Sequence, residues 1–396
     1  MKEAIFIAHR IPFPPNKGEK LRAYHFLKFI AERYSTHLLC HIDEERDLEA
    51  AQKIDLPLAS IHYHFLPRHK RKQRCLKALF FGGSLTVAYF YNRSLQQVFN
   101  TLIRKRPIEL VFGSCAPAAE YVFRAGFLGA RLLLDFMDVD SEKWRAFSKH
   151  TAPPMCWVYA LEARRLRAYE RRIANTFDHV FLVTEAEARL FQRVVAEIDV
   201  AVIENGVNLE RFHPTYQSPL SKEGFVLVFT GAMDYWPNAE GVIWFAQEIF
   251  PQIKKVFPEV TFFIVGKDPL PEVKRLSVDP RLRITGYVED ARDYLALADV
   301  CVVPLRLARG VQNKILEAMA MGKPVVATSA AVEGIKARPG EHLLVADSPD
   351  EFAEAVNLLL RERPLAEKMG KAARKQVEKH YSWEKNLTKL EEFLPR

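Results

Sequence analysis

Short apolar runs alternate with segments of helical periodicity from one end of the chain to the other. The runs are mostly continuous in apolar character, which is typical of strands buried on both faces of a parallel sheet. In the first half we expect strands at Ala4–His9, His37–Ile42, Ile61–Phe65, Leu110–Phe112, Leu132–Phe136 and His179–Val183. In the second half we expect strands at Phe225–Thr230, Val260–Val265, Leu282–Thr285, Val300–Val303, Pro324–Ala327 and Leu343–Val345. Two sets of similar size predict an α/β fold with two Rossmann-like, doubly wound domains facing each other across a cleft.

The boundary between these domains is expected near residues 200–222. A short strand, Val200–Ile203, leads into the turn signal Asn205-Gly206, and the polar stretch Gln217–Gly224 follows. A chain of 396 residues is long enough for two or three domains. We therefore expect a two-domain enzyme whose site lies between its halves.

Hydropathy and cysteine usage predict a protein without membrane-spanning helices, disulfides or a zinc site. No run of about 18 apolar residues occurs, so no membrane-spanning helix is predicted. The apolar run before His9 is too short for a signal peptide. The five cysteines are scattered, with no CxxC pair, which predicts reduced thiols in a cytoplasm, without disulfides or a zinc site.

Positive charge is concentrated in the first half of the chain. Residues 1–200 hold 31 Lys and Arg against 22 Asp and Glu, whereas residues 201–396 hold 26 against 27. Between Leu56 and Ile108 there are ten basic residues and no acidic one. This stretch has three interpretations: a solvated basic face, a surface for anionic lipid, or a nucleic-acid site. No nucleic-acid motif accompanies it, so we expect no nucleic-acid partner.

The loop and helix at 304–324 carry the most informative motif. Arg306, Arg309 and Gly310 precede a helix that is expected to begin near Val311 and to stop at Gly322. The free amides at a helix start, with two arginines beside them, make a site for a diphosphate. Glu317 lies on the same helical face as Gly310 and about 10 Å along the axis, within reach of a ribose. The alternative is an exposed Glu–Lys pair on a surface helix.

Three further loops follow predicted strands. In the first, prolines precede Gly18, which opens a helix near several basic residues; this pattern is either a phosphate contact or a proline-rich connector with solvated lysines. In the second, Gly231 permits close approach of a ligand, and Asp234 supplies a polar group; Trp236 there is either a ligand contact or packing.

The third loop, 134–144, is rich in acids. Asp140 and Ser141 either cap the next helix or join a site, whereas Asp135 and Asp138 are expected to face the cleft. No histidine cluster accompanies these acids, so a tightly bound metal is not predicted.

Three segments together resemble the family-4 retaining glycosyltransferases of the GT-B fold. They are GVQNKILEAMAMGKPVV at 310–326, VIENGVNLERFHP at 202–214 and YSW at 381–383. The segments at 138–144, 230–238 and 308–314 are similar to the sugar transferase branch of bacterial exosortase/PEP-CTERM exopolysaccharide loci. The resemblance covers nearly the whole chain, in the family's order.

The resemblance implies transfer of a sugar from a nucleotide-diphosphate donor to a glycan or polyprenyl-diphosphate-linked acceptor, with retention at the anomeric carbon. It implies an acceptor domain at 1–200, a donor domain at 201–377 and a final segment, 378–396, that returns to the first domain. No cofactor or metal is implied, and the anionic inner face of the membrane is the expected working place. Donor-binding residues are expected at Gly18, Gly231, Asp234, Val288, Arg306, Gly310, Val311, Gln312 and Glu317, and catalytic residues at Asp138, Arg309 and Lys314.

The chain departs from the family in three places. Arg309 stands where a second glutamate is usual, and the usual basic residue after the Gly231 loop is missing. The family's cleft histidine is also absent from the region Asp135–Asp140, where Asp138 is the nearest candidate. Arg306, Arg309 and Lys314 are therefore expected to supply the charge that meets the diphosphate. Two other functions stay open: a nucleotide-sugar epimerase of the same architecture, and a non-catalytic scaffold in a polysaccharide assembly complex.

Overall fold

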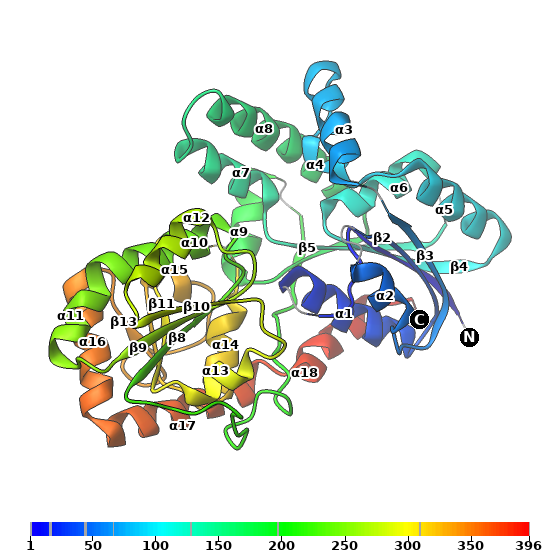
Figure 1. Cartoon of the computed structure of the whole chain (residues 1–396). Helices are drawn as coiled ribbons and strands as arrows, with labels where there is room; N and C mark the ends of the chain where they lie inside the picture. The colour runs from blue at the N-terminus through cyan, green and yellow to red at the C-terminus, as the bar shows by residue number, and fades with distance from the viewer. Residues whose placement is uncertain are drawn as a thin grey trace. The chain divides into compact units, whose positions relative to one another are not determined.

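The structure is a computed structural model that describes residues 2–15, 18–42, 46–65, 67–126, 129–195, 198–308 and 310–395. The chain divides into two compact units (Figure 1). Unit 1 comprises Met1–Glu204 and Leu387–Arg396, and unit 2 comprises Asn205–Asn386. Within the described ranges, no helix is both long and apolar enough to cross a bilayer.

Unit 1 is built on a seven-stranded parallel sheet in the order β3-β2-β1-β4-β5-β6-β7. Its strands are β1 (Glu3–Ala8), β2 (Ser35–Ile42), β3 (Leu58–Phe65), β4 (Ile108–Ser114), β5 (Arg131–Met137), β6 (His179–Leu182) and β7 (Val200–Val202). Its helices are α1 (Gly18–Ala31), α2 (Arg46–Gln52), α3 (Arg68–Phe81), α4 (Leu85–Phe90), α5 (Arg93–Lys105), α6 (Ala119–Ala125), α7 (Asp140–Lys149), α8 (Met155–Ala174) and α9 (Glu185–Val194). The central strand β1 is almost wholly buried, as expected for a strand covered on both faces.

A row of aromatic rings ties the chain's last residues to this sheet. Phe6 of β1 stacks on Phe112 of β4, with ring centroids 5.2 Å apart, and Phe112 stacks on Phe181 of β6 at 6.3 Å. Phe393, in the 3₁₀ segment Thr388–Phe393, meets Phe181 edge-on at 5.2 Å. Offset and edge-on pairs of this kind add to the free energy of apolar burial. The last ten residues therefore complete the core of unit 1.

Unit 2 has a six-stranded parallel sheet in the order β10-β9-β8-β11-β12-β13. Its strands are β8 (Val226–Thr230), β9 (Thr261–Val265), β10 (Leu282–Gly286), β11 (Val300–Val303), β12 (Val325–Ala327) and β13 (Leu344–Val345). Its helices are α10 (Trp236–Trp244), α11 (Phe250–Val256), α12 (Pro271–Arg275), α13 (Arg292–Leu297), α14 (Asn313–Ala320), α15 (Ser329–Val332), α16 (Pro349–Arg361) and α17 (Arg363–His380). A π-helical turn, Phe245–Ile249, joins α10 to α11, and α18 (Trp383–Leu387) leads out of the unit.

Both sheets confirm the predicted α/β fold with two Rossmann-like units. Every predicted strand is present in the structure, with ends displaced by at most three residues. Each sheet also contains a point at which the strand order reverses: between β1 and β4 in unit 1, and between β8 and β11 in unit 2. Ligands of open α/β sheets bind beyond the carboxyl ends of the strands at such points.

One local expectation needs correction, and one of two alternatives left open by the sequence is excluded. The helix at the informative motif begins at Asn313, two residues later than expected, and ends near Gly322, whose φ of 66° only glycine adopts easily. Asp140 and Ser141 do not cap α7, because the N-cap residue is Val139. Carboxylates from other helices accept the first amides instead: Glu187 accepts from Val139 N at 2.8 Å, and Glu170 accepts from Ser141 N at 2.9 Å.

Candidate functional site

The candidate site of unit 2 lies where β8 and β11 end. The loop after β8 leads through Gly231 into α10, and the loop after β11 leads through Gly310 into α14. These strands are hydrogen-bonded neighbours on either side of the reversal in strand order. The topology therefore brings two of the predicted motifs, separated by about 80 residues of sequence, to one edge of the sheet.

Gly231 occupies a position where a Cβ atom would displace two neighbouring side chains. A Cβ atom there would lie 2.7 Å from Asn238 Nδ2 and 3.0 Å from Lys314 Nζ. Gly266, after β9, faces the same backbone, and its Cβ would lie 1.7 Å from the Gly231 carbonyl oxygen. The glycines let the ends of β8 and β9 and the start of α10 pack closely, and they bring the Lys314 amino group against the backbone.

Lys314 reaches from α14 to the loop after β8. Its Nζ donates a hydrogen bond of 2.6 Å to Asn238 Oδ1 and lies 4.2 Å from the centroid of the Phe229 ring. Asn238 is buried, and its Nδ2 donates to the Ala232 carbonyl oxygen at 2.9 Å, which fixes the orientation of the amide. Burial lowers the pKa of Lys314 to about 7, although Glu317 opposes this shift. With Glu317 as the only carboxylate in the described part of the chain that raises its pKa, Lys314 is therefore only partly protonated at neutral pH.

Glu317 lies one turn further along α14 and is half-buried. Among the residues that the structure describes, none donates a hydrogen bond to its carboxylate. Burial raises the pKa of Glu317 to about 7, while the charges of Lys314 and Arg211 lower it. An acceptor group held partly out of water without a donor is suited to receive hydroxyl groups of a ligand.

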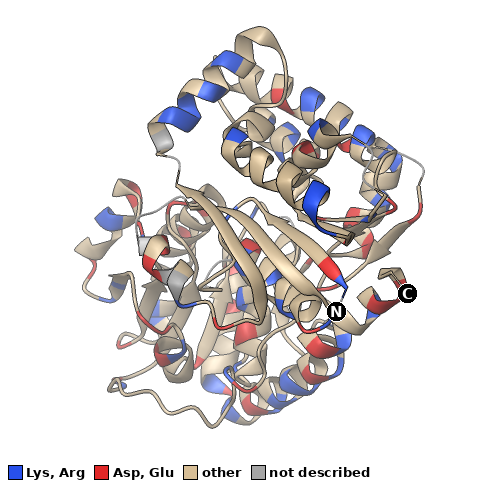
Figure 2. Ribbon diagram, turned by 90° about the vertical axis from the view of Figure 1, so that its right-hand side faces the viewer, with Lys and Arg blue, Asp and Glu red and all other residues tan. Residues whose placement is uncertain are grey.

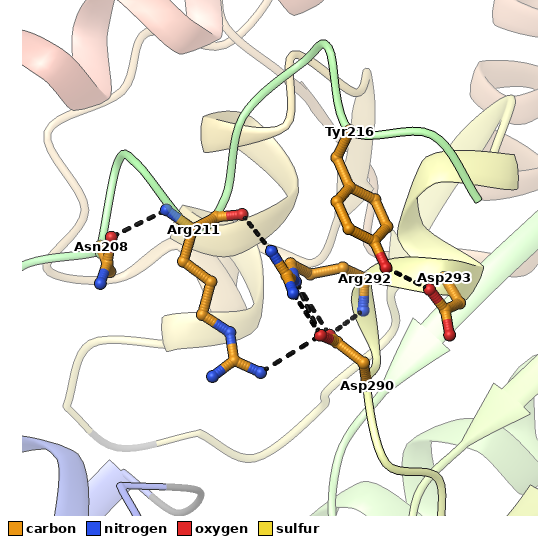
Figure 3. Close-up of polar contacts among 6 residues, drawn as sticks. All are labelled: Asn208, Arg211, Tyr216, Asp290, Arg292 and Asp293. Atoms are coloured by element: carbon orange, nitrogen blue, oxygen red, sulfur yellow. Dashed lines mark hydrogen bonds and ion pairs between the residues drawn. The ribbon is translucent and has the colours of Figure 1, made fainter. Parts of the chain in front are cut away.

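A polar network that the sequence did not predict lies beside this helix (Figure 3). Asp290 accepts two hydrogen bonds from Arg292 Nε, at 3.0 and 2.9 Å, and lies 3.5 Å from the guanidinium of Arg211. Arg292 also donates to the Arg211 carbonyl oxygen at 2.9 Å, and Tyr216 donates to Asp293. After Lys314, the charges that act on the pKa of Glu317 are Arg211, which lowers it, and Asp290, which raises it, so the network contributes to the electrostatic field at this carboxylate. The only feature of the sequence that could have indicated this network is the position of Asp290, two residues after the predicted donor contact Val288.

The start of α14 is held from a second direction. Asn205, in the turn that opens unit 2, donates from Nδ2 to Asn313 Oδ1 at 3.1 Å. Gly310 has a φ of 64°, and Gln312 is the N-cap residue, without a side-chain cap. Gly310, Val311 and Gln312 therefore lead into a helix whose first amides are not occupied by a capping side chain.

The other residues of unit 2 that were predicted to bind the sugar donor form no hydrogen bond or ion pair with Lys314 or Glu317 in the described part of the chain. Asp234 is exposed, and Val288 is half-buried after β10. Arg306 is 55% exposed at its side chain, donates to Glu240 at 2.7 Å from Nε and lies over the Trp244 ring. In this structure Arg306 is thus engaged by a carboxylate of its own unit. Arg309 lies outside the described residues.

Unit 1 presents a different set of groups at and beyond the carboxyl end of β5. Asp138 is half-buried after β5; burial raises the pKa of its carboxyl group, against the charge of Lys143. Asp135, which we expected to face the cleft, is instead fully buried against Arg22, with two hydrogen bonds of 2.7 Å. Arg22 also donates to the Ile203 carbonyl oxygen at 2.7 Å. This buried ion pair is a structural element that joins α1, β5 and the end of β7.

Two residues near Gly18, His9 and Glu19, were not predicted from the sequence as site residues. Gly18 begins α1, and Glu19 next to it contacts both Arg10 and the Nε2 atom of His9. Burial raises the pKa of Glu19, but His9 and Arg10 together lower it well below its usual range. His9 is buried, and its Nδ1 has no hydrogen-bond partner among the residues that the structure describes. Only the position of His9 directly after a strand could have indicated it.

No group of three or more His, Cys, Asp or Glu side chains in the described part of the chain is arranged to hold a metal ion. The five cysteines are free thiols.

Comparisons with known proteins agree with this architecture. Residues 224–362 match the family model described as "Glycosyl transferases group 1". The solved sucrose-phosphate synthase of Thermosynechococcus elongatus superposes with a TM-score of 0.72 over 99% of this chain and 98% of that one, at 17% identity. Anabaena HepE in complex with UDP and glucose gives a TM-score of 0.71 over 99% of both chains, at 16% identity.

The curated relatives are distant. An uncharacterised glycosyltransferase of Methanocaldococcus jannaschii is 23% identical over 55% of this chain and 58% of its own length. A GDP-mannose-dependent α-(1-6)-phosphatidylinositol monomannoside mannosyltransferase of Mycobacterium tuberculosis is 26% identical over 74% of this chain and 77% of its own. A UDP-Gal:α-D-GlcNAc-diphosphoundecaprenol α-1,3-galactosyltransferase of Escherichia coli is 29% identical over 34% of this chain and 38% of its own.

The two sheets and their structural neighbours define a protein of the GT-B fold. The match of residues 224–362 to the glycosyl transferase model, and relatives named as mannosyl- and galactosyltransferases, support a transferase.

Proposed function

We propose that this enzyme transfers a sugar from a nucleotide-diphosphate sugar to a lipid-linked glycan acceptor, with retention of the anomeric configuration, in the synthesis of a bacterial exopolysaccharide. It works in the cytoplasm, at the inner face of the membrane. The relatives support the substrate classes by their names alone: one takes UDP-galactose to a diphosphoundecaprenol-linked sugar, and another takes GDP-mannose to a phosphatidylinositol mannoside.

The observation that carries the proposal is the carboxylate of Glu317, which accepts no hydrogen bond from any residue that the structure describes. It lies about 6 Å along the axis of α14 from the helix start at Asn313, since each residue rises about 1.5 Å. A nucleoside diphosphate with its phosphates at the helix start places its ribose near this carboxylate. Glu317 then accepts from the ribose hydroxyls, and the first amides of α14 and the backbone at Gly310 and Val311 bind the diphosphate.

Lys314 takes the part of the basic residue that is missing after Gly231. During transfer the bond between the anomeric carbon and the diphosphate oxygen breaks, and negative charge develops on the leaving nucleoside diphosphate. A protonated Lys314 next to that oxygen stabilises the charge. The acceptor oxygen forms the new bond on the same face of the sugar, and its proton passes to the leaving phosphate. Arg309 adds positive charge to the same leaving group, and no metal takes part.

The experiment that tests the proposal is a transfer assay with the full-length enzyme. Polyprenyl-diphosphate-linked acceptors are incubated with UDP-, GDP-, ADP- and CMP-sugars, the products are identified by mass spectrometry, and the new anomeric configuration is read by NMR. A glycosylated lipid with the donor's configuration supports the proposal. An inverted product, or transfer to none of the acceptors despite tight donor binding, contradicts it.

The second candidate function is a non-catalytic scaffold of the same fold. It rests on Arg309, which replaces a glutamate usual in the family. The scaffold predicts that Glu317→Ala leaves assembly of the polysaccharide intact in cells, whereas the transferase predicts that it abolishes assembly.

A further inference from the structure

Helix α3 of unit 1 exposes one continuous stripe of basic and aromatic side chains. Along this stripe the exposed residues recur at helical spacing, at positions 69–70, 72–73, 76–77 and 80–81. Phe81 is 89% exposed, Phe80 75% and Leu76 57%. Lys70, Lys72 and Lys77 share the stripe, and the two phenylalanines end the helix immediately before Gly82-Gly83. Large apolar side chains exposed to this extent are costly in water and mark a binding surface.

Helix α8 carries a second stripe of the same composition. Trp157, in its first turn, is 68% exposed, and Arg164 and Arg171 follow on exposed positions. The two acidic residues of α8, Glu162 and Glu170, are fully buried. The helix thus directs its negative charges inward and leaves a cationic, partly aromatic face in contact with solvent.

The two helices are in direct contact, so their stripes belong to one part of unit 1. The guanidinium of Arg165 in α8 donates to the carbonyl oxygens of Ala78 and Leu79 at the end of α3, at 3.1 and 3.2 Å. The buried Glu162 accepts from the Ser84 hydroxyl and from the amides of Leu85 and Thr86 at the start of α4. These bonds fix the end of α3, and with it Phe80 and Phe81, relative to α8.

The charge around these aromatic residues is of one sign. No acidic residue occurs between Leu56 and Ile108. The acidic residues of α7 and α8 after Asp140 are each at most 1% exposed. Figure 2, with Lys and Arg in blue, shows the basic residues of α3 recurring along the helix. A surface that combines cationic side chains with exposed aromatic ones fits a lipid bilayer, which has negatively charged headgroups over an apolar interior.

We propose that the exposed faces of α3 and α8 dock unit 1 onto an anionic lipid bilayer, into which Phe80, Phe81 and Trp157 insert. The lysines and arginines contact the headgroups, and the aromatic rings enter the boundary of the acyl chains. Docking rests on the membrane location given in the proposed function, but it is a property of unit 1 that requires neither donor nor acceptor, so its failure can be told apart from failure of the transfer reaction.

Lipid is favoured over nucleic acid by the apolar residues. A strand of nucleic acid needs cations along its path and rings that bases stack on. Leu76 offers no ring, yet it lies within the stripe, one turn before Phe80 and Phe81. A cluster of aliphatic and aromatic side chains at a helix end inserts into hydrocarbon and has no use in binding a phosphate backbone.

The test is co-sedimentation of the full-length protein with vesicles of phosphatidylcholine, with and without phosphatidylglycerol, in the absence of nucleotide. The wild type is expected to bind the anionic vesicles and to dissociate at high salt. Lys70→Glu/Lys72→Glu/Lys77→Glu is expected to lower binding more than tenfold, since each basic residue near an anionic surface contributes about fivefold, or about 1 kcal/mol. Phe80→Ser/Phe81→Ser is expected to lower binding at least about tenfold while leaving the charge unchanged.

Matched controls come from unit 2. Val278→Ser removes an apolar side chain that is 88% exposed, and Lys371→Glu/Lys375→Glu reverses two exposed charges of α17. Both are expected to leave vesicle binding unchanged, and circular dichroism verifies that every variant is folded. The proposal is overturned if the wild type fails to bind anionic vesicles, or if the control variants weaken binding as much as the α3 variants. It is also overturned if a labelled oligonucleotide binds and vesicles do not.

Discussion

The amino group of Lys314 lies 2.6 Å from the side-chain oxygen of Asn238, across the gap between α14 and the start of α10. Asn238 belongs to α10, which follows the Gly231 loop, and the cation that contacts it comes from another helix, α14. Lys314→Met is expected to weaken binding of a nucleotide-diphosphate sugar by about 10- to 100-fold, because one charged hydrogen bond is lost. Isothermal titration calorimetry measures the change, and Lys371→Met on α17 is the matched control. Unchanged affinity would remove Lys314 from the diphosphate site.

Asn238 acts on the donor through Lys314. Asn238→Ala removes the acceptor that orients the lysine, so donor affinity is expected to fall by less than in Lys314→Met. The double variant should be no weaker than Lys314→Met alone, because both changes remove the same interaction. If the losses of donor affinity in the two single variants add up in the double variant, Asn238 contacts the donor by itself.

Donor affinity is expected to be greatest near pH 7. Burial lowers the pKa of Lys314 to about 7, so above that pH the lysine must take up a proton to bind an anion, and affinity falls. Burial also raises the pKa of Glu317 to about 7, so below that pH the carboxyl group is protonated and accepts ribose hydroxyls poorly. Lys314→Met should abolish the decline at alkaline pH, and Glu317→Gln the decline at acid pH. A flat profile in the wild type, titrated between pH 5 and 9, would contradict both assignments.

Gly231→Ala tests whether the side chains packed against the end of β8 form part of the donor site. The added Cβ would lie 2.7 Å from Asn238 Nδ2 and 3.0 Å from Lys314 Nζ, so these side chains must move. We expect a loss of donor affinity of about tenfold or more with a small change in melting temperature, because only side-chain ends are displaced. A large loss of stability with normal affinity would assign Gly231 a purely structural role.

The ion pair of Arg22 and Asp135 is expected to stabilise unit 1. Both side chains are at most 1% exposed, so Asp135→Asn leaves a buried guanidinium without its counter-charge. Removal of one partner from such a pair costs about 3–5 kcal/mol in the free energy of unfolding. Urea denaturation measures the loss, and Glu32→Gln, at an exposed pair, is the control with little effect. A loss below about 1 kcal/mol would show that the pair is dispensable.

Metal independence is tested by chelation. The proposed transfer uses Lys314, Arg309 and the helix start against the leaving diphosphate, so EDTA at millimolar concentration should leave the rate unchanged. A rate that falls with EDTA and returns with Mg²⁺ or Mn²⁺ would contradict the proposed role of these cations.

Much of the fold was predictable, because strands buried on both faces appear in the sequence as continuous apolar runs. Parallel pairing of such strands then places Gly231 and the 304–314 loop at one edge. The partners of polar side chains were not predictable, since they come from elements distant in sequence. Asp135 looked like a group facing a ligand until the structure placed Arg22 against it, 113 residues away in sequence. The network of Arg211, Asp290 and Arg292 was missed for the same reason.

The most direct measurement of the central claim is the thermal shift of the wild type and of Glu317→Ala with UDP-, GDP-, ADP- and CMP-sugars. A ligand at 100 times its dissociation constant stabilises a protein by about 2.7 kcal/mol, which raises the melting temperature by several degrees. We expect one nucleotide class to raise the melting temperature of the wild type and of the control variant Glu333→Ala, which removes an exposed carboxylate of unit 2. The same class should leave Glu317→Ala unchanged. If Glu317→Ala shifts as much as the wild type does, the donor does not bind along α14.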